Sequence, residues 1–148
     1  MDKLDIQILM LLQENGRMSY REIGDELNTT VMTVTRRVRR MKNTGTIKRF
    51  TVVVDPDAVG RNYGICFLIQ LNCPSAINEV SATLSNCMNL CYLHHITGEF
   101  EIAAMARCRD KEDASEFIKW VSSVRGVAKV IPHSVLKTVK EDLEIDLG

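Results

Sequence analysis

The segment from Thr29 to Lys42, TTVMTVTRRVRRMK, constrains the fold most, because it combines an apolar stripe with dense basic charge. On a helix that advances about 100° per residue, Val34, Val38 and Met41 fall within one narrow sector, which we expect to face a core. With Val34 as origin, Arg36 lies at about 200°, on the side away from that core. The basic residues of the segment are Arg36, Arg37, Arg39, Arg40 and Lys42.

The 148-residue chain has no net charge, but its charge is unevenly divided. Residues 1–50 hold ten Lys/Arg against six Asp/Glu, which leaves +4, and the remaining residues carry −4. A basic segment joined to an acidic one suggests that one half of the chain meets a polyanion. No acid occurs between Glu26 and Asp55, so we expect the arginines to repel one another unless a polyanion neutralises them. A merely basic, solvated helix surface is the alternative.

The first fifty residues predict three short helices, each with a start signal. Asp2 can cap the first, Ser19 and Glu22 have capping-box spacing for the second, and Thr30 can cap the third. Gly45 marks the end of the third helix.

Thr46 to Val54 follows, is rich in Ile, Val and Thr, and predicts a strand. Three helices, with a short turn between the second and the third, followed by a strand, describe a winged helix-turn-helix. Because arginine suits bidentate contacts to phosphate and guanine, DNA binding is the favoured interpretation of the basic third helix.

The stretch LDIQILMLLQENGRMSYREIGDELNTTVMTVTRRVRRMKNTGTIKRFTVVVDPDAVG resembles the N-terminal half of the Lrp/AsnC (leucine-responsive, feast/famine) transcription regulators. The matching features are the opening Leu-Asp, the Asn-Gly-Arg turn from Asn15 to Arg17, the patterned run from Val34 to Ile47, and Val-Asp-Pro at Val54 to Pro56, closing at Gly60. The resemblance implies that the third helix enters the major groove of DNA.

The second half predicts a ferredoxin-like domain, with an antiparallel sheet and both helices on one face. The fold class is therefore α+β, a winged helix-turn-helix followed by a ferredoxin-like βαββαβ domain. We expect a DNA-binding domain over 1–50, a linker over 51–62 and a regulatory domain over 63–148. The expected strands are Tyr63 to Leu71, Leu90 to Thr97, Phe100 to Cys108 and Val127 to Val139, and the expected helices are capped by Ser75 and Asp110.

Helices on one face leave the other face of an apolar sheet uncovered, so we expect self-association through it. A dimer presents two recognition helices, which predicts a two-fold symmetric site on double-stranded DNA. The resemblance extends the expected assembly from a dimer to an octamer.

The resemblance also places an amino-acid effector near the turn between the middle strands, Thr97-Gly98-Glu99-Phe100-Glu101. Gly98 can let the backbone approach a small zwitterion, and Glu101 can meet its amino group. Glu101 stands where the family often has Asp, and the last strand has Val130 and Pro132 where relatives often have threonines. A plain hairpin turn is the alternative interpretation of Gly98.

Two enzyme or metal interpretations compete with a regulator. Cys87, Cys91, His94 and His95 are metal-ligand types, but their spacing is not that of a zinc knuckle, and adjacent histidines on a strand point to opposite faces.

The second is the siroheme decarboxylase group, which looks like a relative of this two-domain fold and uses His and Arg at a porphyrin. Here His94, His95, Arg107 and Arg109 could take that role. The arginine-rich helix and the Thr-Gly-x-Phe-acid turn favour the regulators. No Ser-His-Asp arrangement, P-loop or GxGxxG is visible, so we expect no catalytic centre, no metal site and no cofactor.

The expected protein is therefore a cytoplasmic, sequence-specific transcription regulator. Five scattered cysteines suit reduced thiols, and neither a signal-peptide pattern nor a membrane-length apolar run is present. We expect base contacts from Thr33 and Arg36, with Met32 reaching a thymine methyl. Phosphate contacts are expected from Thr30, Arg37, Arg39, Arg40, Lys42, Lys48 and Arg49.

Overall fold

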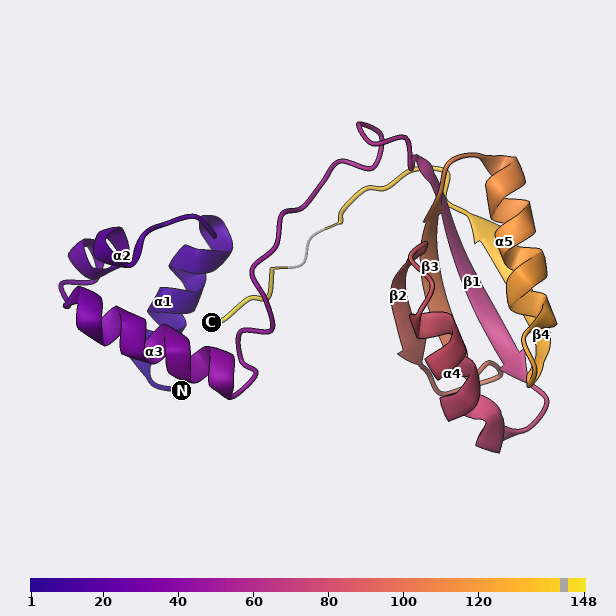
Figure 1. Cartoon of the computed structure of the whole chain (residues 1–148), viewed down its shortest axis with the longest axis horizontal. Coiled ribbons are helices and arrows are strands. Elements are labelled where there is room, and N and C mark those ends of the chain that lie inside the picture. Colours follow the sequence, from indigo (N-terminus) through magenta and orange to yellow (C-terminus); the bar gives the residue numbers. More distant parts are fainter. Residues whose placement is uncertain (142–143) are drawn as a thin grey trace. The chain divides into compact units, whose positions relative to one another are not determined.

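The structure is a computed structural model that describes residues 1–141 and 144–148. Its contacts divide the chain into two compact units, Met1–Val53 with Glu141–Gly148, and Val54–Lys140 (Figure 1). The C-terminal segment, which the sequence assigns to the second domain, therefore groups with the first unit. There, the Gln13 side-chain amide donates a 3.0 Å hydrogen bond to the Ile145 carbonyl. Among the described residues, no helix is long and apolar enough to cross a membrane.

The first unit contains the three predicted helices. They are α1 (Lys3–Glu14), α2 (Tyr20–Glu26) and α3 (Val31–Asn43). Each start signal is confirmed, because Asp2 and Ser19 form complete capping boxes and Thr30 accepts from the Thr33 N–H at 3.1 Å. The α3 stripe is also confirmed: Val34, Val38 and Met41 are at most 1% exposed and pack with Ile8 of α1 and Ile23 of α2.

Asp5 is the one fully buried charged side chain among the described residues. Its carboxylate accepts from the Asp2 backbone N–H at 3.1 Å and from Arg37 Nη1 at 2.9 Å, and it also pairs with Arg40 Nη2. The Asp2 carboxylate meets the same Arg37 nitrogen at 2.6 and 2.7 Å. This network ties the N-terminus of α1 to one side of α3.

The predicted strand from Thr46 to Val54 is wrong for this chain, because that segment forms no strand in the structure. A strand needs a neighbour for its backbone N–H and C=O groups, and the ladders of the described residues do not include this segment. Val52 and Val53 are 79% and 78% exposed, which is unusual for β-branched residues. The helix-turn-helix is therefore present without the wing strand.

The second unit is a four-stranded antiparallel sheet with two α-helices, which confirms the ferredoxin-like prediction. The strands are β1 (Tyr63–Leu71), β2 (Leu90–His95), β3 (Ile102–Cys108) and β4 (Val127–Ser134), in the order β2-β3-β1-β4. The α-helices are α4 (Ile77–Ser85) and α5 (Lys111–Ser123), preceded along the chain by a single 3₁₀ turn η1 (Pro74–Ala76).

Both helices pack on the same face of the sheet (Figure 1). The core lies between them and alternate residues of the central strands, such as Phe67 of β1 and Ile102 of β3, which are at most 1% exposed. Phe67 meets Phe117 of α5 edge-to-face with ring centroids 5.9 Å apart. The intervening residues of both strands point to the face that carries no helix.

Several element ends differ from the sequence prediction. Ser75 does not cap α4, because η1 occupies that position and the helix begins two residues later without a side-chain cap. Strand β4 ends at Ser134, where it pairs with Ile65, and not at Val139. The Val135 N–H still donates to the Gly64 carbonyl at 2.9 Å, but β1 begins at Tyr63, so it has no residues left to pair with the end of the predicted strand. Strand β2 ends at His95 and β3 begins at Ile102, so the connection between these two strands is longer than predicted.

The buried carboxylate network predicts acid lability of the first unit. Arg37 lowers the pKa of Asp2 chiefly by hydrogen bonding. For Asp5, burial by itself raises the pKa, but hydrogen bonds from the Asp2 N–H and Arg37 bring it below its ordinary value. Depressed folded-state pKa values mean that this stabilisation is present above about pH 4 and is lost as pH falls through the folded pKa values.

We therefore expect the helical signal of the first unit to decline below about pH 4. In Asp5→Asn the unit should be less stable at pH 7, and its stability should depend less on pH between pH 5 and 2. Far-UV circular dichroism measures this, while fluorescence of Trp120, the single tryptophan, follows the second unit. An unchanged acid midpoint and pH slope in Asp5→Asn would contradict the role assigned to this carboxylate.

Candidate nucleic-acid interface

The turn between α2 and α3 shapes the candidate interface. The Thr29 N–H donates to the Gly24 carbonyl at 2.8 Å, and Asn28 takes a left-handed conformation with φ of 49°. A Cβ on Gly24 would lie 3.0 Å from the Thr29 carbonyl oxygen, so the tight connection leaves little room for a side chain there. The turn thus sets where the N-terminus of α3 emerges.

The side of α3 opposite its buried stripe is exposed. Met32 is 80% exposed, and Arg36 and Arg39 are also exposed. In the described part of the chain, neither arginine makes a side-chain hydrogen bond or ion pair. Thr33 lies half-buried at the border of this side, with its hydroxyl 2.9 Å from that of Thr30. Two cations, a hydroxyl and a flexible apolar side chain therefore share one accessible helix side.

Arg37 and Arg40 differ from the other arginines because carboxylates from α1 hold them. The Arg37 side chain is 20% exposed and that of Arg40 56% exposed. From the sequence, the arginines are expected to repel one another unless a polyanion neutralises them, but Asp2 and Asp5 of the same chain already supply carboxylates to two of them. More than thirty residues separate the partners, so helical spacing alone could not reveal the pairing.

Basic residues continue beyond α3. The ammonium of Lys42 lies 5.9 Å from the centroid of the Phe50 ring. Lys48 and Arg49 are exposed on the extended segment that follows the helix. The candidate interface thus includes cations both on the outer side of α3 and on the segment after it.

The candidate effector turn, residues 97–101, is anchored to the sheet. The Ile96 N–H donates to the Glu101 carbonyl at 2.9 Å, and Gly98 has φ of 125°. Glu101 Oε2 accepts from the Leu71 N–H at 2.9 Å, so part of this carboxylate secures the end of β1. Thr97, Gly98 and Glu99 are exposed, whereas Phe100 and Glu101 are half-buried.

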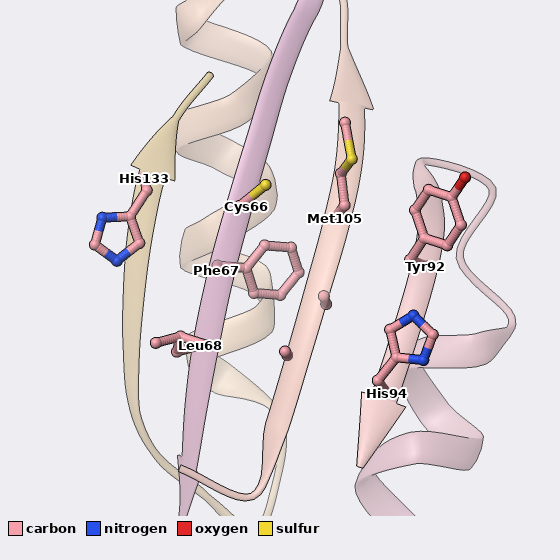
Figure 2. Close-up of a pocket in the computed structure, with 9 residues that line it drawn as sticks. Cys66, Phe67, Leu68, Tyr92, His94, Met105 and His133 are labelled. Atoms are coloured by element: carbon pink, nitrogen blue, oxygen red, sulfur yellow. The ribbon is translucent and has the colours of Figure 1, made fainter. Parts of the chain in front are cut away.

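The helix-free face of the sheet contains an apolar hollow of about 400 Å³ (Figure 2). Cys66 lies between its cross-strand partners Met105 of β3 and His133 of β4. On β2, Tyr92 and His94 stack with ring centroids 6.0 Å apart. The open face is therefore built mainly from apolar, aromatic and imidazole groups.

The two histidines considered for a porphyrin site do not converge. His94 lines the hollow on the open face, whereas His95 Nε2 lies 2.7 Å from the Ser81 hydroxyl of α4, on the opposite face. Arg109 donates to Asp113 at the start of α5 at 3.1 Å. This separation of the two histidines confirms the prediction from strand alternation.

The described residues include no group of three His, Cys, Asp or Glu side chains suited to a metal ion. Among the thiols, burial raises the pKa of Cys108 to about 11, so this thiol stays protonated at neutral pH.

Comparison with known proteins agrees with this architecture. Residues 1–42 match the AsnC-type helix-turn-helix domain, and residues 66–145 match the Lrp/AsnC ligand binding domain. A helix-turn-helix transcriptional regulator from Pyrococcus furiosus is 35% identical over 146 residues, which cover 98% of this chain and 97% of the relative. One from Pyrococcus horikoshii is 33% identical over 147 residues, which cover 99% and 98%.

Solved structures show the same fold. A crystal structure of another Pyrococcus horikoshii regulator superposes with a TM-score of 0.88 at 27% identity and covers 97% of this chain and 98% of that one. The structure of a Neisseria meningitidis transcriptional regulator in complex with L-methionine gives a TM-score of 0.91 at 23% identity and covers 99% and 97%. The sequence match to both domain models and the near full-length relatives show that this chain belongs to the Lrp/AsnC family of helix-turn-helix transcriptional regulators.

Proposed function

We propose that this regulator binds double-stranded DNA sequence-specifically, with α3 in the major groove. The observation that carries the proposal is the accessible side of α3, where Arg36 and Arg39 have no intramolecular partner in the described chain and lie near Met32 and Thr33. Side chains that are exposed and uncommitted can reach base edges and phosphates without first breaking an internal contact. The buried stripe on the opposite side holds the helix in place as a rigid support.

Base contacts are assigned to Thr33 and Arg36, with Met32 against a thymine methyl. Phosphate contacts are assigned to the cations on the edges of this side and on the following segment, together with the helix N-terminus. The phosphate-binding residues are Thr30, Arg39, Lys42, Lys48 and Arg49. Arg37 and Arg40 are not included in this set, because carboxylates of the same chain already pair with them.

Replacing Arg36 by alanine should relax the sequence preference at one base step by about 1–3 kcal/mol. The matched variant Arg39→Ala removes the same charge from the same helix side. It should weaken all duplexes alike and reduce the slope of log affinity against log salt by about 0.9. Fluorescence anisotropy with duplex from the protein's own promoter and a scrambled duplex, titrated across salt, measures both quantities. If both variants bind as the unchanged protein does, α3 does not read DNA.

We also propose that the open face of the sheet forms the dimer interface. Cys66, Leu68 and Met105 point to that face, and an apolar sheet surface of this kind is unfavourable in water. Pairing two such faces by a two-fold axis would present two recognition helices to a two-fold symmetric operator. Dimers of this kind are proposed to assemble further, up to an octamer.

The cysteines offer a direct test of this interface. Cys66 lies on the open face and Cys73 lies beyond the end of β1, and both are exposed in the single chain. We expect a thiol reagent to label Cys73 at any concentration. Labelling of Cys66 should be slow at high protein concentration and should accelerate on dilution, as dimers dissociate. Equal labelling rates for both thiols at all concentrations would place the interface elsewhere.

We further propose that an amino acid binds at the turn of residues 97–101. The exposed Gly98 backbone and the nearby Glu101 carboxylate offer partners for a zwitterion. The match of residues 66–145 to a ligand-binding domain supports a small-molecule effector. L-Methionine is a reasonable first candidate, because the similar Neisseria protein was crystallised in complex with it.

Glu101→Gln should weaken effector binding about tenfold or more, because the amide keeps the acceptor for Leu71 but loses the charge that pairs with an amino group. Glu99→Gln is the matched control: it removes the same charge from an exposed position of the same turn and should have a smaller effect. Isothermal titration calorimetry with L-methionine and a panel of other amino acids measures both. Equal losses in the two variants, or none, would remove Glu101 from the site.

A further inference from the structure

We propose that Asp2 and Asp5 set the sequence-independent part of the DNA affinity, because they hold Arg37 and Arg40 against α1 and so withhold two cations of α3 from DNA phosphates. This inference rests on the proposed DNA-binding function. Two acids at the start of the first helix would thereby control which arginines of the third helix can reach DNA.

The contacts show how the two arginines are held. Arg37 Nη1 lies 2.7 and 2.6 Å from the two Asp2 oxygens and 2.9 Å from an Asp5 oxygen. Arg40 Nη2 pairs with the other Asp5 oxygen. Both acids lie at the start of α1, so the guanidinium groups are drawn toward that helix. To reach a phosphate, each arginine must first leave its carboxylate.

The geometry indicates that stability is not the only result of this network. A strong Arg–carboxylate pair uses two guanidinium nitrogens in a parallel fork. Here, Arg37 meets both acids through a single nitrogen, and its Nε is buried without a hydrogen-bond partner in the described residues. The arrangement thus neutralises the cation without using its full bonding capacity.

A second capping box in the same unit serves as an internal comparison. Ser19 and Glu22 cap α2 with the same reciprocal hydrogen bonds that Asp2 and Asp5 make at α1. Glu22 is exposed and pairs with no cation among the described residues. Capping a helix here therefore does not require an arginine, and the pairing with Arg37 and Arg40 is an additional feature of the α1 box.

The consequence for binding follows from the nature of non-specific affinity. Contacts between cations and phosphates supply essentially all of the affinity for a random duplex, whereas base contacts add affinity only at the operator. Withholding Arg37 and Arg40 lowers affinity for every duplex, but it leaves the base-reading side of α3 unchanged. The ratio of operator to non-operator binding is then set by Arg36 and its neighbours.

The test replaces Asp2 by asparagine, because asparagine caps a helix as well as aspartate does but has no charge to hold Arg37. Anisotropy titrations on promoter and scrambled duplexes should show a steeper salt slope on both, by at most about 0.9, because Arg37 keeps its contact to Asp5. The affinity for both duplexes at low salt should rise about threefold or more, while the promoter-to-scrambled ratio stays the same, because a phosphate contact strengthens every duplex alike. Glu22→Gln changes the net charge equally and should leave slope and affinity as in the unchanged protein.

The double variant Asp2→Asn with Arg37→Ala identifies the responsible cation, because its salt slope should return to that of the unchanged protein. Circular dichroism verifies that each variant keeps its helices. An unaltered or shallower slope in Asp2→Asn, or a steeper slope that persists in the double variant, would overturn the inference while the DNA-binding proposal stands. If the unchanged protein does not prefer its promoter over the scrambled duplex, the proposed function fails, and this inference fails with it.

Discussion

The buried carboxylate of Asp5 is the interaction on which the first unit depends. It is completely removed from solvent, which is costly for a charge unless its oxygens are paired. The structure pairs them with the Asp2 backbone and two arginines of α3. One side chain therefore completes the cap of the first helix, orients the third helix and determines which arginines of that helix are free.

The second unit depends on a different constraint, the two faces of one sheet. Alternate residues of β1 and β3 pack under α4 and α5, and the residues between them point to a face that no helix covers. Gly126 shows how closely the covered side is packed. Its φ is 97°, and a Cβ there would lie 2.9 Å from that of Ala76. The contrast between a close-packed face and an open one is the physical basis for proposing self-association.

Most of the fold could be predicted because it depends on local signals. Caps at Asp2, Ser19, Thr30 and Asp110 begin helices where the sequence places them, and strand alternation separates His94 from His95. Strand ends were less predictable, because they depend on where a neighbouring strand begins. The segment after α3 illustrates this: its composition favours a strand, but it joins no ladder among the described residues.

The candidate interface likewise combines features that follow from local signals with features that depend on how the helices pack. The start of each helix, the buried stripe of α3 and the exposed side that carries Arg36 and Arg39 can all be predicted from the sequence, since they follow from caps and a period of about 3.6 residues. The pairing of Arg37 and Arg40 with Asp2 and Asp5, in contrast, is visible only in the folded chain. The reason is physical: periodicity describes which residues share one side of one helix, whereas an ion pair between two helices depends on how those helices pack.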